Sequence, residues 1–191
     1  MENDRRTKRT KLLLKNAFTE LLSMKTLNAI SVKELCELAD INRGTFYLHY
    51  QDIYDLKQNL ENELYEQILN IANAAPINID EDTSYTFFLE MFRSVEKQKP
   101  LLKAFLGPNG DISFLRQIQT LFKEQYLSIL LHGKEAKNLA DLDYSYNFIA
   151  SGFIGLVESW IYEETPTPAE EMAKLISKIV FDGLPSLVNF L

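Results

Sequence analysis

The stretch Ser31–Tyr50 reads S-V-K-E-L-C-E-L-A-D-I-N-R-G-T-F-Y-L-H-Y, and its pattern predicts two short helices joined by a tight turn. Ser31 and Glu34 have the spacing of a capping box, in which each side chain satisfies a backbone N–H group at a helix start. The apolar residues that follow have the spacing of an amphipathic helix: Val32, Leu35, Cys36 and Ala39. Asp40-Ile41-Asn42 interrupts that helix, because Asp and Asn tolerate a left-handed turn better than other non-glycine residues. The last residue of this interruption can cap a second helix over residues 43–50.

Two short helices joined by a tight turn form a helix-turn-helix, whose second helix can enter the major groove of DNA. The same pattern also fits an ordinary helical hairpin in an all-α core, because capping boxes and short helices are common. The string T-F-Y-L-H-Y at Thr45–Tyr50 favours the DNA-binding interpretation. Ile41 and Arg43-Gly44 precede this string, and Asp52 and Leu56 follow it.

Together these residues resemble the DNA-binding domain of the tetracycline-repressor (TetR) family, closely over about Thr7–Lys57 and weakly beyond. The residues expected at the DNA interface are Lys8, Ser31, Arg43, Gly44, Thr45, Tyr47, His49 and Tyr50. Arg43, Thr45 and Tyr47 are expected to touch bases or the backbone beside them, since Arg and Thr suit base edges and an aromatic ring can pack on a thymine methyl group. Lys8 and residues 49–50 are expected to hold phosphates.

Two positions depart from the family pattern. Asp40 stands in the turn where the family often has Gly, which the left-handed tolerance of Asp accommodates. Ile53 stands where many members have a Lys near the start of the next helix, so one expected phosphate contact is in doubt.

The composition favours an all-α fold, and the residue patterns along the chain predict about nine helices. The 191 residues are 46% hydrophobic, with six Pro, seven Gly and no sustained strand-like alternation. The resemblance implies a three-helix helix-turn-helix domain over residues 1–57 and a larger helical ligand-binding and dimerisation domain over residues 58–191. One Cys excludes an intramolecular disulfide, and the longest apolar run is about half the ~20 residues of a membrane span. We therefore expect a cytoplasmic protein with no membrane contact.

The net charge of −7 is divided unevenly along the chain. Residues 1–57 hold ten Lys or Arg and eight Asp or Glu, whereas residues 58–191 hold ten and nineteen. The positive residues near the N-terminus are Arg5, Arg6, Lys8, Arg9, Lys11 and Lys15. Positive charge beside a helix-turn-helix is typical of a phosphate-binding module, although a solvated arm with no partner has the same composition.

Aromatic residues at helical spacing in the second domain predict either an ordinary core or an apolar pocket. The candidate pocket residues are Phe88, Met91, Phe92, Phe105, Phe114, Ile118, Phe122 and Phe148. The family resemblance favours the pocket, and its ligand would be a small hydrophobic or aromatic effector. The stretch G-P-N-G-D-I-S-F at Gly107–Phe114 also looks like one in the C-terminal domain of a subgroup of TetR-like regulators.

Small residues recur in the penultimate predicted helix, where they would let another helix approach closely. The last two helices either complete the core of one chain or join two chains, and the family resemblance implies the second. The candidate interface residues are Ser151, Gly152, Gly155, Ser159, Ile176, Ile179 and Val180.

Catalysis has little support, because the two His residues lie in no cluster with metal-ligand spacing and no catalytic motif or phosphate loop appears. We expect no cofactor and no metal. The leading hypothesis is a ligand-responsive repressor that binds a palindromic operator as a homodimer. The alternative is an interaction protein or coactivator of the same fold that regulates through a protein partner, with weak or no DNA binding.

Overall fold

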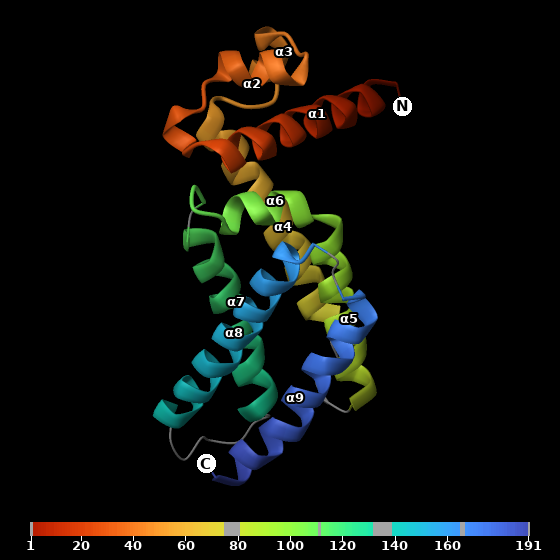
Figure 1. Ribbon diagram of the computed structural model, residues 1–191, viewed down its shortest axis with the longest axis vertical. Helices are drawn as coiled ribbons and strands as arrows, with labels where there is room; N and C mark the ends of the chain where they lie inside the picture. The colour runs from red at the N-terminus through yellow and green to blue at the C-terminus, as the bar shows by residue number, and fades with distance from the viewer. Residues whose placement is uncertain (1, 75–80, 111, 132–138, 165–166, 191) are drawn as a thin grey trace. The chain divides into compact units, whose positions relative to one another are not determined.

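The computed structural model describes residues 2–74, 81–110, 112–131, 139–164 and 167–190, and these residues form nine α-helices and no strand (Figure 1). The all-α fold expected from the sequence is confirmed. The helices are α1 (Glu2–Met24), α2 (Val32–Ala39), α3 (Arg43–Tyr47), α4 (Ile53–Ala74), α5 (Glu81–Lys97), α6 (Lys99–Leu106), α7 (Ile112–Leu131), α8 (Leu139–Tyr162) and α9 (Ala169–Phe190). None of the helices in the described part of the chain is long and apolar enough to span a membrane.

The chain divides into two compact units. The first comprises Met1–Tyr65 and Pro100–Phe114, and the second comprises Glu66–Lys99 and Leu115–Leu191. The first unit therefore contains α1 to α3, most of α4 and α6, whereas α5, α8, α9 and most of α7 belong to the second. These units are defined by packing, and a division of function near residue 57 stays a prediction.

In the first unit, α1 supports the helix-turn-helix through the apolar face that its sequence predicts. Its buried residues are Leu14, Ala17, Phe18, Leu21 and Leu22. This face packs against α2. The ring of Phe18 also meets that of Phe105 in α6, edge to face, with ring centroids 6.5 Å apart. Burial of this many apolar side chains on one face holds α2 and α3 on a rigid support.

Local hydrogen bonds fix the connection between α2 and α3. Ser31 Oγ caps α2 by accepting a hydrogen bond from the Glu34 N–H at 3.2 Å, and the Glu34 carboxylate itself pairs with Lys25. Asp40 ends α2 in the left-handed region with φ 53° and ψ 48°. Asn42 Oδ1 then caps α3 by accepting from the Gly44 N–H at 2.8 Å. The sequence prediction of two capped helices around a left-handed turn is confirmed.

Helix α3 is shorter than predicted, because it ends at Tyr47 and not at Tyr50. The Phe46 carbonyl accepts hydrogen bonds from both the His49 N–H at 2.9 Å and the Tyr50 N–H at 3.0 Å, and the chain after Tyr47 continues as a turn. Asp52 then caps α4 by accepting from the Asp55 N–H at 2.8 Å, while the Asp55 carboxylate accepts from the Gln51 N–H.

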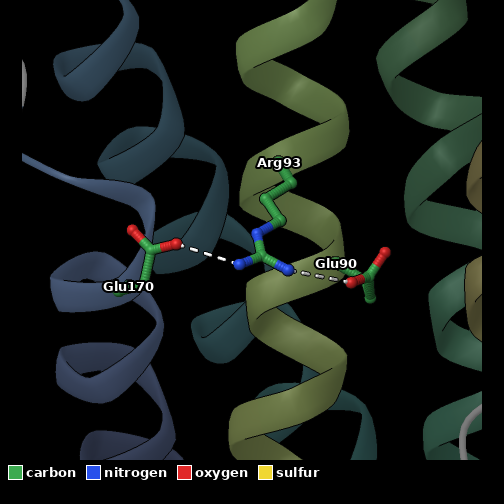
Figure 2. Close-up of polar contacts among 3 residues, drawn as sticks. All are labelled: Glu90, Arg93 and Glu170. Carbon is green, nitrogen blue, oxygen red and sulfur yellow. Dashed lines mark hydrogen bonds and ion pairs between the residues drawn. The ribbon is translucent and has the colours of Figure 1, made fainter.

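In the second unit, α5 packs along α9, and α8 also contacts α9 (Figure 1). Arg93 of α5 joins these elements, because its guanidinium contacts Glu170 in the first turn of α9 at 3.0 Å and Glu90 at 3.5 Å (Figure 2). The Trp160 Nε1–H donates to the Thr167 carbonyl at 2.7 Å and so ties the end of α8 to the segment before α9.

The turn between α6 and α7 depends on glycine. The Gly110 N–H donates to the Gly107 carbonyl at 2.9 Å, which closes the turn predicted from the sequence. A Cβ atom at Gly110 would lie 1.8 Å from the Phe105 carbonyl oxygen, so no other residue fits without displacing the backbone.

Candidate functional site

The outer face of α3 projects away from the core of the first unit. Phe46 is fully buried, whereas Arg43 and Gly44 are exposed and Thr45 is half-buried. Tyr47 is 58% exposed. This arrangement leaves a guanidinium, a glycine backbone and an aromatic ring on one accessible surface. Such groups can contact base edges, phosphates and thymine methyl groups.

Aromatic packing holds this surface in place. The Phe46 ring lies 5.4 Å from that of Tyr47 and 5.7 Å from that of Tyr50, measured between centroids. Tyr50 is only 3% exposed, and its burial, with the charges of Glu63 and Asp55, raises its pKa to about 12. The Tyr50 ring therefore supports α3 from beneath, and its predicted phosphate contact stays a prediction.

The other predicted DNA contacts lie at the surface of the same unit. Lys8 is exposed on α1, and His49 is half-buried after α3. Ser31 is also exposed, and its hydroxyl can donate to a phosphate while it accepts the cap hydrogen bond. The structure thus brings all eight predicted residues into one compact unit, and their roles in DNA binding stay predictions.

Leu48, which follows Tyr47 at the end of α3, was not among the residues predicted from the sequence. Its side chain is 80% exposed, more than that of any other large hydrophobic residue in the described chain. Leu48 lies between aromatic residues in the string Thr45–Tyr50, so the sequence did not predict that its side chain would be exposed. Ile53, by contrast, is only 5% exposed and belongs to the core, so it supplies no cation at the position where the family resemblance implies Lys.

The predicted pocket residues fall into three groups. Phe88, Met91, Phe92, Ile118 and Phe122 lie in the second unit, and Phe105 and Phe114 lie in the first with ring centroids 5.8 Å apart. Phe148 is 79% exposed and does not lie with the buried residues.

A cluster of aromatic rings joins α5, α7 and α8 in the second unit. Phe87 meets Phe122 at 6.2 Å, and Phe153 lies 5.8 Å from Phe88 and 5.9 Å from Phe92, measured between centroids. Phe92 also meets Trp160 at 5.1 Å. Sequence spacing did not single out Phe153, because its role depends on how α8 packs against α5.

The predicted dimer interface lies mostly on an exposed stripe of α8. Ser151, Gly152, Gly155 and Ser159 are all exposed. Two large rings extend this stripe toward the N-terminus of α8, since Tyr144 is 74% exposed and Phe148 occupies the next turn. On α9, Ile179 is exposed, Val180 is half-buried and Ile176 is buried, so Ile176 packs within its own chain.

The described residues contain no group of three His, Cys, Asp or Glu side chains that could hold a metal ion.

Comparison with known proteins supports a regulatory role. A TetR family model described as a transcriptional regulator C-terminal region matches residues 82–182. No curated protein sequence is a significant match.

Among solved structures, a TetR transcriptional regulator from Streptococcus agalactiae 2603V is 21% identical, with a TM-score of 0.61 over 94% of this chain and 98% of that one. The fatty acid degradation regulator FadR from Bacillus halodurans is 14% identical, with a TM-score of 0.67 over 92% and 96%. The dihydroxyacetone kinase operon activator DhaS is 14% identical, with a TM-score of 0.54 over 93% and 97%. At these identities the likeness shows the shared fold.

Proposed function

Because the chain belongs to the TetR family of transcriptional regulators, we propose that it is a cytoplasmic repressor that binds a palindromic operator as a homodimer and is released by a small molecule. The observation that carries this proposal is the capped α2–α3 hairpin, whose outer face exposes Arg43, Tyr47 and Leu48 above a buried aromatic support.

The exposed face of α3 formed by Arg43, Gly44, Tyr47 and Leu48, here called the reading surface, suits direct contact with bases. Arg43 can bind guanine or phosphate through two parallel hydrogen bonds, and Tyr47 and Leu48 can pack on thymine methyl groups. Gly44 lets the backbone approach the DNA closely, since it has no side chain. These contacts need α3 to enter a major groove, as the second helix of a helix-turn-helix does.

Dimerisation through α8 and α9 explains why large apolar side chains of these two helices are exposed in a single chain, which is unfavourable in water. Tyr144 and Phe148 place two aromatic rings in solvent, and Leu175 and Ile179 add exposed apolar surface on α9. Large apolar side chains exposed at helical spacing are typical of a protein interface when they form a common surface. A Cβ atom added at Gly152 or Gly155 would meet nothing within 4 Å, so packing within one chain does not account for these glycines. A two-fold dimer would place two α3 helices about 34–36 Å apart on successive major grooves.

The aromatic cluster of α5, α7 and α8 is the proposed effector site. Phe88, Phe92, Phe122 and Phe153 offer ring faces and edges, which suit a small, largely apolar or aromatic molecule. Such a molecule releases the operator only if it binds the DNA-incompetent arrangement more tightly.

The second candidate function is an interaction protein or coactivator with weak or no DNA binding. The burial of Ile53 favours it, because the start of α4 then presents the acids Asp52 and Asp55 without the usual cation. DhaS, which shares the fold, is an operon activator, so the fold also supports activation.

Binding to the DNA upstream of the protein's own gene separates these functions. We expect sequence-specific, salt-sensitive binding, and we expect Arg43→Ala or Tyr47→Ala to cost about 1–3 kcal/mol on the operator. Glu96→Ala, at an exposed position of α5, is the control and should bind like wild type. If both α3 variants bind like wild type, the assigned reading surface is wrong, and if wild type shows no sequence preference, the repressor proposal fails.

A further inference from the structure

One hydroxyl in the interior of the second unit has no hydrogen-bond partner. Ser177 of α9 is 3% exposed, and its Oγ atom makes no hydrogen bond with the described residues. Glu61 Oε1 is also buried without a hydrogen bond, but it lies 2.8 Å from the Lys57 ammonium in an ion pair. Buried polar groups are normally hydrogen-bonded, because an unmade bond is unfavourable once water is removed. Ser177 is therefore an exception that needs an explanation.

Packing alone does not require a serine at this position. Ser177 continues a stripe of small buried residues that recur every four positions on α9, after Ala169 and Ala173. Such a stripe lets α9 pack closely along α5. Alanine at position 177 would pack in the same way without leaving a hydroxyl unbonded. The buried Tyr146 of α8, by contrast, donates its hydroxyl hydrogen to the Gln119 carbonyl of α7, so the fold does satisfy a polar group elsewhere in this interior.

The contact between Arg93 and Glu170 shows which part of α5 lies opposite Ser177. Arg93 is near the end of α5 and Glu170 is in the first turn of α9, so the two helices run in opposite directions (Figure 1, Figure 2). Ser177 lies about 10 Å along α9 from Glu170, at 1.5 Å per residue. The same distance back along α5 reaches the turn between Ser84 and Phe88. Ser84 is itself only 6% exposed, so two buried serines lie near this level of the unit.

This turn of α5 belongs to the aromatic cluster of the second unit. The Phe88 ring lies 5.8 Å from the Phe153 ring of α8, and Phe153 lies 5.9 Å from Phe92, measured between centroids. Ser177 therefore adds a hydroxyl beside a group of apolar rings. Small-molecule sites are mostly apolar and contain a few polar groups that fix the orientation of the ligand. A buried hydroxyl with no partner in its own chain can serve as such a group.

The polar groups beside the cluster are uncharged. No Lys, Arg or His is buried among the residues that the structure describes. Lys174 and Lys178, which flank Ser177 in α9, are exposed, and Arg93 is already paired with two carboxylates. A carboxylate or phosphate brought to Ser177 would lose its water without gaining a cation, which is strongly unfavourable. An alcohol or carbonyl group has no such cost, and a serine hydroxyl can donate a hydrogen bond to it or accept one from an alcohol.

We propose that the Ser177 hydroxyl anchors the polar end of the effector, and that the effector is an uncharged apolar molecule with an alcohol or carbonyl group. This inference rests on the proposed function, which places the effector in the aromatic cluster of α5, α7 and α8, and it adds α9 to that site. The apolar part of the molecule contacts the Phe88 and Phe153 rings, while its oxygen makes the hydrogen bond that the protein leaves unmade. The anchor thus selects by charge among molecules of similar apolar size.

The test compares two eight-carbon probes, 1-octanol and octanoate, at about pH 7, where the carboxylic acid is ionised. Trp160 is the one tryptophan of the chain, and its ring lies 5.1 Å from that of Phe92, so its fluorescence reports binding at the cluster. Kd is measured for wild type, for Ser177→Ala and for the control Ser23→Ala. The control removes a serine hydroxyl that already donates to the Glu20 carbonyl in the first unit.

Wild type should bind 1-octanol roughly tenfold or more tightly than octanoate, because only the alcohol is uncharged. Ser177→Ala should lose roughly fivefold in affinity for 1-octanol and keep its affinity for octanoate, as expected for one lost hydrogen bond. The ligand-free Ser177→Ala protein should also melt at a higher temperature than wild type, because it no longer buries an unbonded hydroxyl. Ser23→Ala should bind both probes like wild type.

Three results would overturn the inference: equal affinity of wild type and Ser177→Ala for 1-octanol, octanoate binding as tight as that of 1-octanol, or no binding of either probe by wild type. A melting temperature of Ser177→Ala at or below that of wild type would also count against it, since the hydroxyl would then have a partner in the folded protein. Sequence-specific binding of wild type to the operator is measured separately, so the proposed function can stand without the anchor. Absence of that binding, with the Ser177-dependent preference retained, would reject the repressor and keep the ligand site.

Discussion

At the scale of single residues, the α3 surface combines one buried anchor with unusually exposed apolar side chains. Phe46 is fully buried, and the neighbouring Tyr47 and Leu48 point into solvent. An exposed leucine gains nothing from the core, and it is stabilised only when a partner covers it. A thymine methyl group in the major groove is the partner that the proposed function supplies.

Leu48→Ala should weaken operator binding by about 1 kcal/mol, roughly fivefold. Burying one methylene group against the DNA contributes about that much free energy, and the alanine variant loses this contribution. On an operator in which deoxyuridine replaces thymidine at the contacted position, the same substitution should cost nearly nothing. Fluorescence-anisotropy titrations of wild type and Leu48→Ala on the two operators form a double-mutant cycle. Leu38→Ala, on the exposed side of α2, is the control. Equal losses of affinity on the two duplexes would show that Leu48 does not contact that methyl group.

The buried Tyr50 predicts a loss of stability at high pH. Its folded pKa of about 12 lies above the ordinary value of 10.0, so the folded state holds the proton more tightly than the unfolded state. The resulting stabilisation is complete below pH 10 and is lost as the pH rises toward 12. Urea unfolding from pH 9 to 12 should show a shallower decline for Tyr50→Phe than for wild type, and Tyr144→Phe, at an exposed ring, should decline like wild type.

At the scale of elements, α8 has two faces with different roles. One face buries Tyr146, Val157, Trp160 and Ile161 in the second unit. The opposite face carries Tyr144 and the small residues, with open space around both glycines. Because a Cβ atom added at either glycine meets no atom within 4 Å, substitution there tests assembly separately from folding.

Gly155→Leu should therefore give a folded monomer, because the added side chain is accommodated in one chain and obstructs the close approach of two α8 helices. Sedimentation should show the loss of the dimer, and operator affinity should fall greatly because each half-site is then bound alone. Glu96→Leu adds the same side chain at an exposed position of α5 and should stay dimeric. A Gly155→Leu protein that sediments as a dimer would remove α8 from the interface.

At the scale of the whole molecule, two helices, α4 and α7, contribute residues to both compact units. Helix α4 begins beside the α2–α3 hairpin in the first unit and continues beyond Tyr65 as part of the second. The effector proposal places ligand binding in the second unit and DNA reading in the first. Ligand binding can weaken DNA binding only if the ligand binds the DNA-incompetent arrangement more tightly than the DNA-competent one.

A small apolar or aromatic effector should raise the melting temperature and also weaken operator binding. A thermal-shift screen of fatty acids and planar aromatic compounds, repeated with operator DNA present, measures both effects. Phe88→Ala should bind operator like wild type and respond less to any hit, since it removes a ring of the cluster in the second unit. Hits that stabilise the protein without reducing operator affinity would establish a pocket without a switch.

The sequence by itself determined the features that depend on neighbouring residues. The caps at Ser31, Asn42 and Asp52, the left-handed Asp40 and the glycine turn after α6 involve partners within a few positions, so their residue types predict the backbone. The helical spacing of apolar residues likewise predicted the face of α1 that packs on α2. The family followed from the same local string.

Only the tertiary structure decided which apolar residues are covered, because burial depends on elements far apart in the chain. Ile53 and Leu48 are both aliphatic and lie five positions apart, yet one is in the core and the other is exposed. Phe148 is aromatic like the buried Phe92 but lies on the exposed face of α8, and Phe105 and Phe114 belong to a different unit from Phe88. Periodicity identifies an apolar face, but the element that packs against that face is fixed only when the whole chain folds.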